Sequence, residues 1–231
     1  PLPLFGGWSF GTVAAIAAGS AAAATASLGY WRLRSRPGEE WRASVSSQLT
    51  VASFCGVILA HALLAALAAF AASLVLSLGF KGLELDAFWS ILLMGVTTGF
   101  TAWLVHLSVS QLTTVRMSNL LMAFVGIGTL TSMVTASDSE WWRTHFSHLG
   151  TFSDLSSLLF NGTLVVGGLL VMAFAIYVSN DIRRRVASGD LLEERSPRFV
   201  ATMFVTMGVM LAGVGLVPVD LSLLIHNLCA S

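Results

Sequence analysis

The sequence predicts an all-α, polytopic transmembrane helical bundle with six spans, the start of a seventh helix and the N-terminus outside. Three observations support this fold class. Hydrophobic residues make up 55% of the chain and charged residues only 10%, whereas a soluble domain carries about 25% charged residues. The few charges lie in short polar gaps between long apolar stretches. Ten of the twelve Lys and Arg residues fall in alternate gaps, which is typical of a chain that crosses a membrane repeatedly.

A bilayer crossing needs about 20 consecutive apolar residues. Six stretches meet this requirement: roughly Trp8–Leu28, Val51–Leu78, Phe88–Leu112, Met117–Ala136, Leu158–Val178 and Phe199–Val217. Backbone groups in lipid must be hydrogen-bonded within their own segment, and the alternating pattern of a membrane barrel strand is absent. We therefore expect each stretch to be a helix, and the second one to be tilted or to protrude from the bilayer.

Lys and Arg accumulate on the cytoplasmic side of a membrane, so the gaps that hold them give the orientation. The first, third and fifth gaps hold Arg32, Arg34, Arg36, Arg42, Arg116, Arg183, Arg184, Arg185, Arg195 and Arg198. Lys81 and Arg143 lie in the second and fourth gaps. Tryptophans mark both expected interfaces: Trp8, Trp89, Trp141 and Trp142 outside, and Trp31 and Trp41 inside. The odd-numbered gaps are therefore expected to be cytoplasmic.

The composition also bounds the setting and the partners. Eleven of the twelve cations are arginine and alanine is abundant, which is typical of a GC-rich bacterial genome and suggests a bacterial plasma membrane. A net charge of zero argues against a nucleic-acid partner, which would require a basic face. The expected partners are the lipid bilayer and other membrane protein chains.

Small residues indicate where helices approach one another closely. The first span has them at every fourth position: Gly11, Ala15, Gly19, Ala23 and Ser27. Such a face favours close packing against a helix of this or another chain, although an alanine-rich helix also produces the spacing by chance. The glycines of the sixth span, Gly208, Gly213 and Gly215, are interpreted as packing positions or a flexible point near Pro218.

Both ends of the chain carry an expectation. The chain begins with Pro1 rather than Met, which suggests missing residues upstream. The apolar run 221–231 is too short to span a bilayer. It either lies in the interface or is the beginning of a seventh helix that has been cut, and we expect the second.

The fourth gap, expected outside, holds the densest group of chemistry-capable side chains in S-D-S-E-W-W-R-T-H-F-S-H-L-G-T-F-S-D-L-S-S. His145 and His148 share one face if this gap is helical. With His226 beyond the sixth span and the carboxylate of Asp154 they would suffice to bind zinc, which activates a bound water. Ser147 and Asp154 are the candidate catalytic residues. The competing interpretation is a set of solvated residues at helix ends, with Asp154 as the N-cap of the fifth span.

Two further histidines, His61 and His106, lie inside apolar runs. Both are about 9–14 Å from the inner ends of their helices at 1.5 Å per residue, so they could face each other. A pair of this kind can ligate a haem iron or relay a proton. A neutral histidine that hydrogen-bonds across helices is the commoner arrangement, and Asn161 at the start of the fifth span is expected to bond in the same way.

The strings H-F-S-H-L-G and L-F-N-G-T-L-V-V-G-G-L-L resemble the S-x-L-G…F-N…G pattern of the DUF998 family, a group of uncharacterised prokaryotic multi-span membrane proteins. The C-terminal string G-V-G-L-V-P-V-D-L-S-L-L-I-H-N-L-C-A-S is similar to that family's G-x-x-x-P stretch, which is followed by a His and a small residue. The resemblance implies that the family pattern marks five positions here: Ser147, Gly150, Asn161, Pro218 and His226. It also implies that the polar ones lie on the outer side of the membrane and that further helices follow the histidine.

This resemblance covers only residues 117–231. We therefore expect a three-helix N-terminal membrane unit at 1–116 and a DUF998-like unit at 117–231. A more distant likeness links the polar residues to membrane hydrolases of the alkaline-ceramidase type, which assemble Ser, Asp and His around zinc. The S-x-x-x-H and H-x-x-x-H spacings of those enzymes are absent here.

Three functions are compatible with the sequence. The first is an integral membrane protein without a catalytic motif, acting as a subunit or scaffold of a larger membrane complex. The second is a membrane-embedded, metal-dependent hydrolase at the outer interface, using the zinc candidates named above. The third is a transporter or proton-coupled carrier that uses His61 and His106. No Walker A, Rossmann or kinase signature is present.

Overall fold

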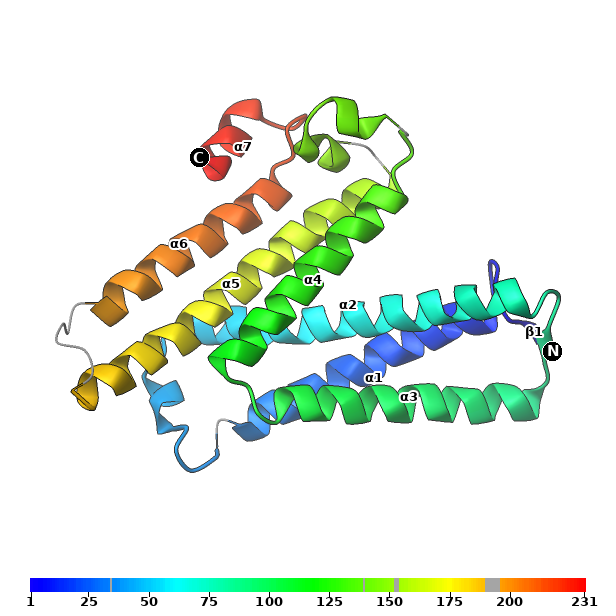
Figure 1. Ribbon diagram of the computed structural model, residues 1–231, viewed down its shortest axis with the longest axis horizontal. Helices are drawn as coiled ribbons and strands as arrows, with labels where there is room; N and C mark the ends of the chain where they lie inside the picture. The colour runs from blue at the N-terminus through cyan, green and yellow to red at the C-terminus, as the bar shows by residue number, and fades with distance from the viewer. Residues whose placement is uncertain (34, 139, 152–153, 190–195) are drawn as a thin grey trace. The chain divides into compact units, whose positions relative to one another are not determined.

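The computed structural model describes residues 1–33, 35–138, 140–151, 154–189 and 196–231. Two arginines used for the orientation, Arg34 and Arg195, lie outside the described residues. Within the described ranges, six helices are long and apolar enough to span a membrane: α1 Phe10–Leu33, α2 Ser47–Gly79, α3 Ala87–Val109, α4 Thr114–Val134, α5 Leu155–Ala187 and α6 Ser196–Leu216 (Figure 1). A short helix, α7 Leu223–Ala230, follows them. The prediction of an all-α polytopic bundle is confirmed, and the chain is a multi-pass membrane protein.

Two helices are much longer than a bilayer crossing requires. Helices α2 and α5 each have 33 residues, which corresponds to about 50 Å at 1.5 Å per residue against a hydrocarbon core of about 30 Å. The fifth span was expected to end at Val178, but α5 continues through Arg183–Arg185. Arginine is a good helix former, so charge ends the apolar run without ending the helix.

The chain divides into two compact units, which are described separately. The first consists of Pro1–Glu40 and Val57–Leu112, and the second of Trp41–Gly56 and Thr113–Ser231. The expected boundary at 116 falls a few residues beyond this division. The assignment of Trp41–Gly56 to the second unit had no counterpart in the sequence-based division.

In the first unit, α1 contacts both α2 and α3 (Figure 1). A stripe of four alanines along α1 is almost completely buried: Ala14, Ala18, Ala22 and Ala26. Beside this stripe, a Cβ atom placed on Gly11 would lie 2.6 Å from the Cβ of Ser73 in α2. A Cβ on Gly29 would lie 2.9 Å from Cγ1 of Val109 in α3. The neighbours of the small-residue helix thus belong to this chain.

The first unit also contains the two strands that the structure describes, β1 Leu2–Pro3 and β2 Glu84–Leu85, which pair in antiparallel register. Leu4, Phe10, Ala14 and Leu85 form a buried cluster next to this pair. The paired strands hold the beginning of the chain against the α2–α3 connection.

In the second unit, α5 lies between α4 and α6 (Figure 1). A Cβ on Gly208 of α6 would lie 2.6 Å from the carbonyl oxygen of Gly168 in α5, so the two backbones touch. Gly215 meets α5 in the same way at the carbonyl of Asn161, and Gly213 meets Cys229 of α7. The three glycines of the sixth span are therefore packing positions.

Candidate functional site

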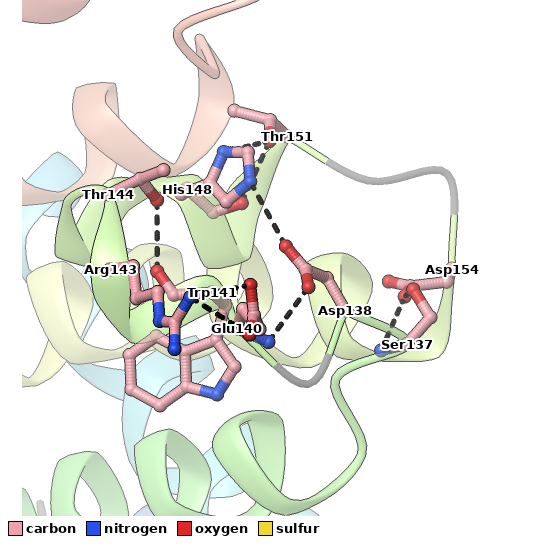
Figure 2. A network of polar contacts seen from close by, with 9 residues as sticks. All are labelled: Ser137, Asp138, Glu140, Trp141, Arg143, Thr144, His148, Thr151 and Asp154. Atoms are coloured by element: carbon pink, nitrogen blue, oxygen red, sulfur yellow. Dashed lines mark hydrogen bonds and ion pairs between the residues drawn. The ribbon is translucent and has the colours of Figure 1, made fainter.

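The polar segment that the sequence singled out connects α4 to α5, and we call residues 137–154 the 137–154 loop. The described part of this loop contains two short 3-10 helices, η2 Trp141–Arg143 and η3 Phe146–Gly150. Figure 2 shows its polar side chains gathered in a network around Asp138, Glu140 and His148.

The 3-10 helix η3 is fixed to α5 through a backbone carbonyl. The carbonyl oxygen of Gly150 accepts a hydrogen bond from Nδ2 of Asn161 at 2.9 Å and another from Oγ of Ser157 at 2.9 Å. A Cβ on Gly150 would lie 2.5 Å from Oδ1 of Asn161, so a larger residue here would displace the Asn161 amide. Leu149 is completely buried. Asn161 was expected to hydrogen-bond across helices, but its bond reaches the carbonyl of Gly150 in the loop.

Asp154 is the N-cap of α5. Its carboxylate accepts hydrogen bonds from the backbone N–H of Ser157 at 2.9 Å and from Oγ of Ser137 at 2.5 Å. These bonds, with that of the Ser137 hydroxyl the largest contribution, hold the pKa of Asp154 below its ordinary value. The carboxylate is therefore ionised at neutral pH. It acts here as a hydrogen-bond acceptor that ties the two ends of the loop together.

The two loop histidines lie beside each other. The ring centroids of His145 and His148 are 5.8 Å apart with the rings tilted by 31°. Nε2 of His148 lies 3.7 Å from Oδ2 of Asp138, and its Nδ1 lies 3.2 Å from Oγ1 of Thr151 (Figure 2). Asp138 was not among the sequence candidates. The 3-10 helix η2 separates it from His148 in the sequence, so local spacing gave no signal for this pair.

The remaining metal and catalytic candidates have separate surroundings. His226 of α7 is buried, and its Nδ1 donates a hydrogen bond to the carbonyl of Val217 at 2.8 Å. The hydroxyl of Ser147 makes no hydrogen bond with the described part of the chain. Among the described residues, no group of three or more His, Cys, Asp or Glu could hold a metal ion. A zinc site formed by His145, His148 and His226 stays a prediction that this arrangement does not support.

The histidines inside the spans differ from each other. His61 of α2 is buried: its Nδ1 donates to the carbonyl of Val57 at 2.7 Å, and its Nε2 lies 2.9 Å from Oγ of Ser108 in α3. With Nδ1 as donor, Nε2 of the neutral ring accepts from Ser108. His106 is exposed and has no hydrogen bond to its side chain among the described residues. The commoner interpretation of an intramembrane histidine, a bond across helices, therefore fits His61.

A buried arginine is the main feature that the sequence did not indicate. Arg42 was interpreted as a topogenic charge, yet it is only 7% exposed. Its guanidinium carbon lies 4.6 Å from the ring centroid of Trp41 and 4.9 Å from that of Tyr177, and Nη1 donates to the Tyr177 hydroxyl at 3.0 Å. The rings of Trp41 and Tyr177 pack edge to face against each other, and the faces of both stabilise the buried cation beside them.

No family model matches the chain, and no curated protein and no solved structure was found that matches it. The resemblance to the DUF998 family over residues 117–231 therefore has no support beyond the motif strings and stays a prediction.

Proposed function

We propose that this multi-pass protein is a non-catalytic subunit or scaffold of a larger complex in a bacterial plasma membrane, with the 137–154 loop on the extracytoplasmic side. Its apolar helices support the membrane location. The pattern of alternate arginine-rich gaps supports the orientation. The observation that carries the role in a complex is a glycine pair on α3.

Gly95 and Gly99 of α3 form a G-x-x-x-G pair within an apolar helix. This spacing places two small residues on one face, where the backbone of a second membrane helix can approach closely. Both glycines are exposed, and a Cβ placed on either would meet nothing within 4 Å. Gly11, Gly29 and Gly208, in contrast, already touch a neighbouring helix. The pair on α3 thus has the sequence of a packing face and no helix of its own unit against it.

The exposed face of α3 extends beyond the glycine pair. Within this helix only Val105 and Val109 are buried, and the large side chains that flank the glycines are exposed, among them Ile91 at 74% and Trp103 at 55%. Lipid solvates such side chains well. A glycine pair, however, offers lipid little contact area and offers a second helix a close approach. We therefore assign the face to another membrane chain.

The experiment is purification from native membranes in a mild detergent, followed by measurement of the mass of the complex. Wild-type protein should bring a stoichiometric membrane partner, and the double variant Gly95→Leu/Gly99→Leu should lose it because the added side chains keep the helices apart. Gly126→Leu in α4 is the matched control, since Gly126 is equally exposed with nothing near its Cβ position. Recovery of wild type as a clean monomer would contradict the proposal.

A metal-dependent hydrolase is the second candidate, favoured by one observation. The ring of His145 lies beside that of His148, and His148 lies next to the carboxylate of Asp138. A movement of the loop that brought these groups and a further ligand around one ion would complete a zinc site. Metal analysis of the purified protein decides the matter. Zinc bound in wild type and lost in His148→Ala would establish the site, and wild type without zinc would exclude it.

A further inference from the structure

A pocket of about 170 Å³ opens in the second unit at the end of α5 that carries the arginines. On the same measure a single water needs only about 10–15 Å³, so the pocket holds a group considerably larger than water. Its walls come from the segment before α2, from the first residues of α2, and from α5 and α6. All of these belong to the second unit.

The lining of this pocket changes from polar to apolar along α5. Arg183, Asn180 and Ser179 line it toward the charged end of the helix, and Ile176 and Ala175 line it further in. The distance along the helix from Arg183 to Ala175 is about 12 Å at 1.5 Å per residue. In α6, Ala201 and Val205 add to the apolar wall. The polarity of the pocket therefore matches that of a phospholipid, which has a polar headgroup at the interface and apolar chains toward the bilayer core.

At the polar end, several hydrogen-bonding groups have no partner among the described residues. The side chains of Arg183 and Asn180 make no hydrogen bond or ion pair with the described residues. The indole N–H of Trp41, which also lines the pocket, lacks a partner within the same ranges. No acidic residue is among those described as lining the pocket. Asp181, next in sequence to Asn180, accepts instead from Oγ1 of Thr114 in α4 at 2.5 Å.

The surroundings add a second preference for a negative charge. Helix α2 begins at Ser47, directly after the lining residues Ser44, Val45 and Ser46. The N-terminus of a helix carries a partial positive charge and attracts anions. Arginine and phosphate form charge-assisted hydrogen bonds, which are stronger than those between neutral groups.

We propose that this pocket binds an anionic phospholipid, with the phosphate headgroup at Arg183 and Asn180 and the start of an acyl chain along the apolar wall of α5 and α6. Free phosphate shares the headgroup chemistry, but it has no apolar part that could contact the wall formed by Ile176, Ala201 and Val205. A lipid uses both ends. The site thus selects headgroup charge at the membrane interface and adds a specific lipid contact to the topogenic role of these arginines.

The test is native mass spectrometry of the detergent-solubilised protein titrated with dioleoylphosphatidylglycerol, with dioleoylphosphatidylcholine, and with inorganic phosphate. Phosphatidylglycerol should bind with about tenfold higher affinity than phosphatidylcholine, and Arg183→Gln should remove most of that difference. Arg185→Gln, which makes the same charge change on the same helix outside the pocket lining, should leave it unchanged. Ala201→Leu should weaken binding of both lipids because it fills the apolar end.

Three results would overturn the proposal. Equal losses in the Arg183 and Arg185 variants would indicate general electrostatic attraction rather than a site. Equal affinity for the two lipids would remove the headgroup selectivity. Displacement of the bound lipid by millimolar inorganic phosphate, together with unchanged lipid binding in Ala201→Leu, would show that the pocket holds free phosphate. Because Arg183 is exposed and unpaired within the described residues, its variant is expected to fold, and its thermal unfolding checks this.

Discussion

Helices α5 and α3 are both apolar enough to cross a membrane, yet they are packed very differently. Within the apolar 18-residue stretch that could cross the membrane, 56% of α5 is buried, whereas only 6% of the corresponding stretch of α3 is buried. The buried helix has Gly168 against the backbone of α6 and Thr163 against Gly128 of α4. The exposed helix has its glycine pair in open space. Apolarity therefore places a helix in the membrane, and the complementarity of small and large residues decides whether this chain or something else covers it.

The largest effect is expected from filling the contact between α5 and α6. A Cβ on Gly168 would lie 2.8 Å from the backbone nitrogen of Ala212 and 2.9 Å from its Cβ. Gly168→Leu should destabilise the second unit by about 3 kcal/mol, because a backbone contact cannot yield as a side chain can. Gly162→Leu on the same helix, where nothing lies near the Cβ position, is the control. Thermal unfolding in detergent measures both, and equal effects would refute the contrast.

The features that could be predicted from the sequence are those that depend on local patterns. Uninterrupted apolar stretches predicted six helices, because a helix in lipid must satisfy its backbone alone. The position of Asp154 before L-S-S predicted its N-cap, since capping is a local interaction. Both predictions needed only neighbouring residues.

Contacts between distant residues could not be predicted in the same way. The bond from Asn161 to Gly150, the Asp138–His148 pair and the burial of Arg42 depend on how helices and loops meet in space. An arginine in a gap between spans has the same sequence signal whether it is solvated or packs against the rings of Trp41 and Tyr177. The exposure of α3 likewise has no signal in hydropathy alone.

A smaller effect is expected at the N-cap of α5. Asp154→Ala should cost about 1 kcal/mol, because a backbone N–H at the helix start loses its acceptor. Hydrogen bonds lower the pKa of Asp154 in the folded state. Its contribution is therefore complete above the unfolded value of about 3.9 and is lost as the pH falls through the folded pKa.

Chemical or thermal unfolding between pH 7 and pH 3 measures this contribution. Wild type should lose stability at the acid end more steeply than Asp154→Ala, because the variant has no carboxylate there to protonate. Asp154→Asn keeps an acceptor oxygen and loses the charge. It should therefore be less destabilised than Asp154→Ala at neutral pH, and its stability should be equally independent of pH toward the acid end. Parallel pH profiles for all three proteins would show that the cap does not contribute.

In the first unit, the bond between His61 and Ser108 should have a still smaller effect. Hydrogen bonds between membrane helices average about 0.6 kcal/mol in double-mutant cycles. The cycle of His61→Leu, Ser108→Ala and the double variant should therefore give a coupling energy near that value. Ser132 and Ser156, which bond to each other in the second unit at 3.1 Å and to each other's carbonyls at 2.8 Å, give a matched cycle. A coupling near zero at His61 would indicate that its bond to Val57 in its own helix suffices.

The smallest effect is expected at the exposed polar pair of the 137–154 loop, and it bears on the hydrolase candidate. Nε2 of His148 and Oδ2 of Asp138 are 3.7 Å apart at partly exposed side chains, and such pairs contribute about 0–1 kcal/mol. Asp138→Asn should therefore change stability no more than Glu140→Gln, which removes the exposed pair with Arg143, and added salt should screen both effects. A zinc-bound loop would behave differently, because a metal that binds only the folded state stabilises it. Addition of EDTA should then lower the unfolding temperature of wild type but not of His148→Ala, whereas a purely electrostatic pair responds to salt and not to the chelator.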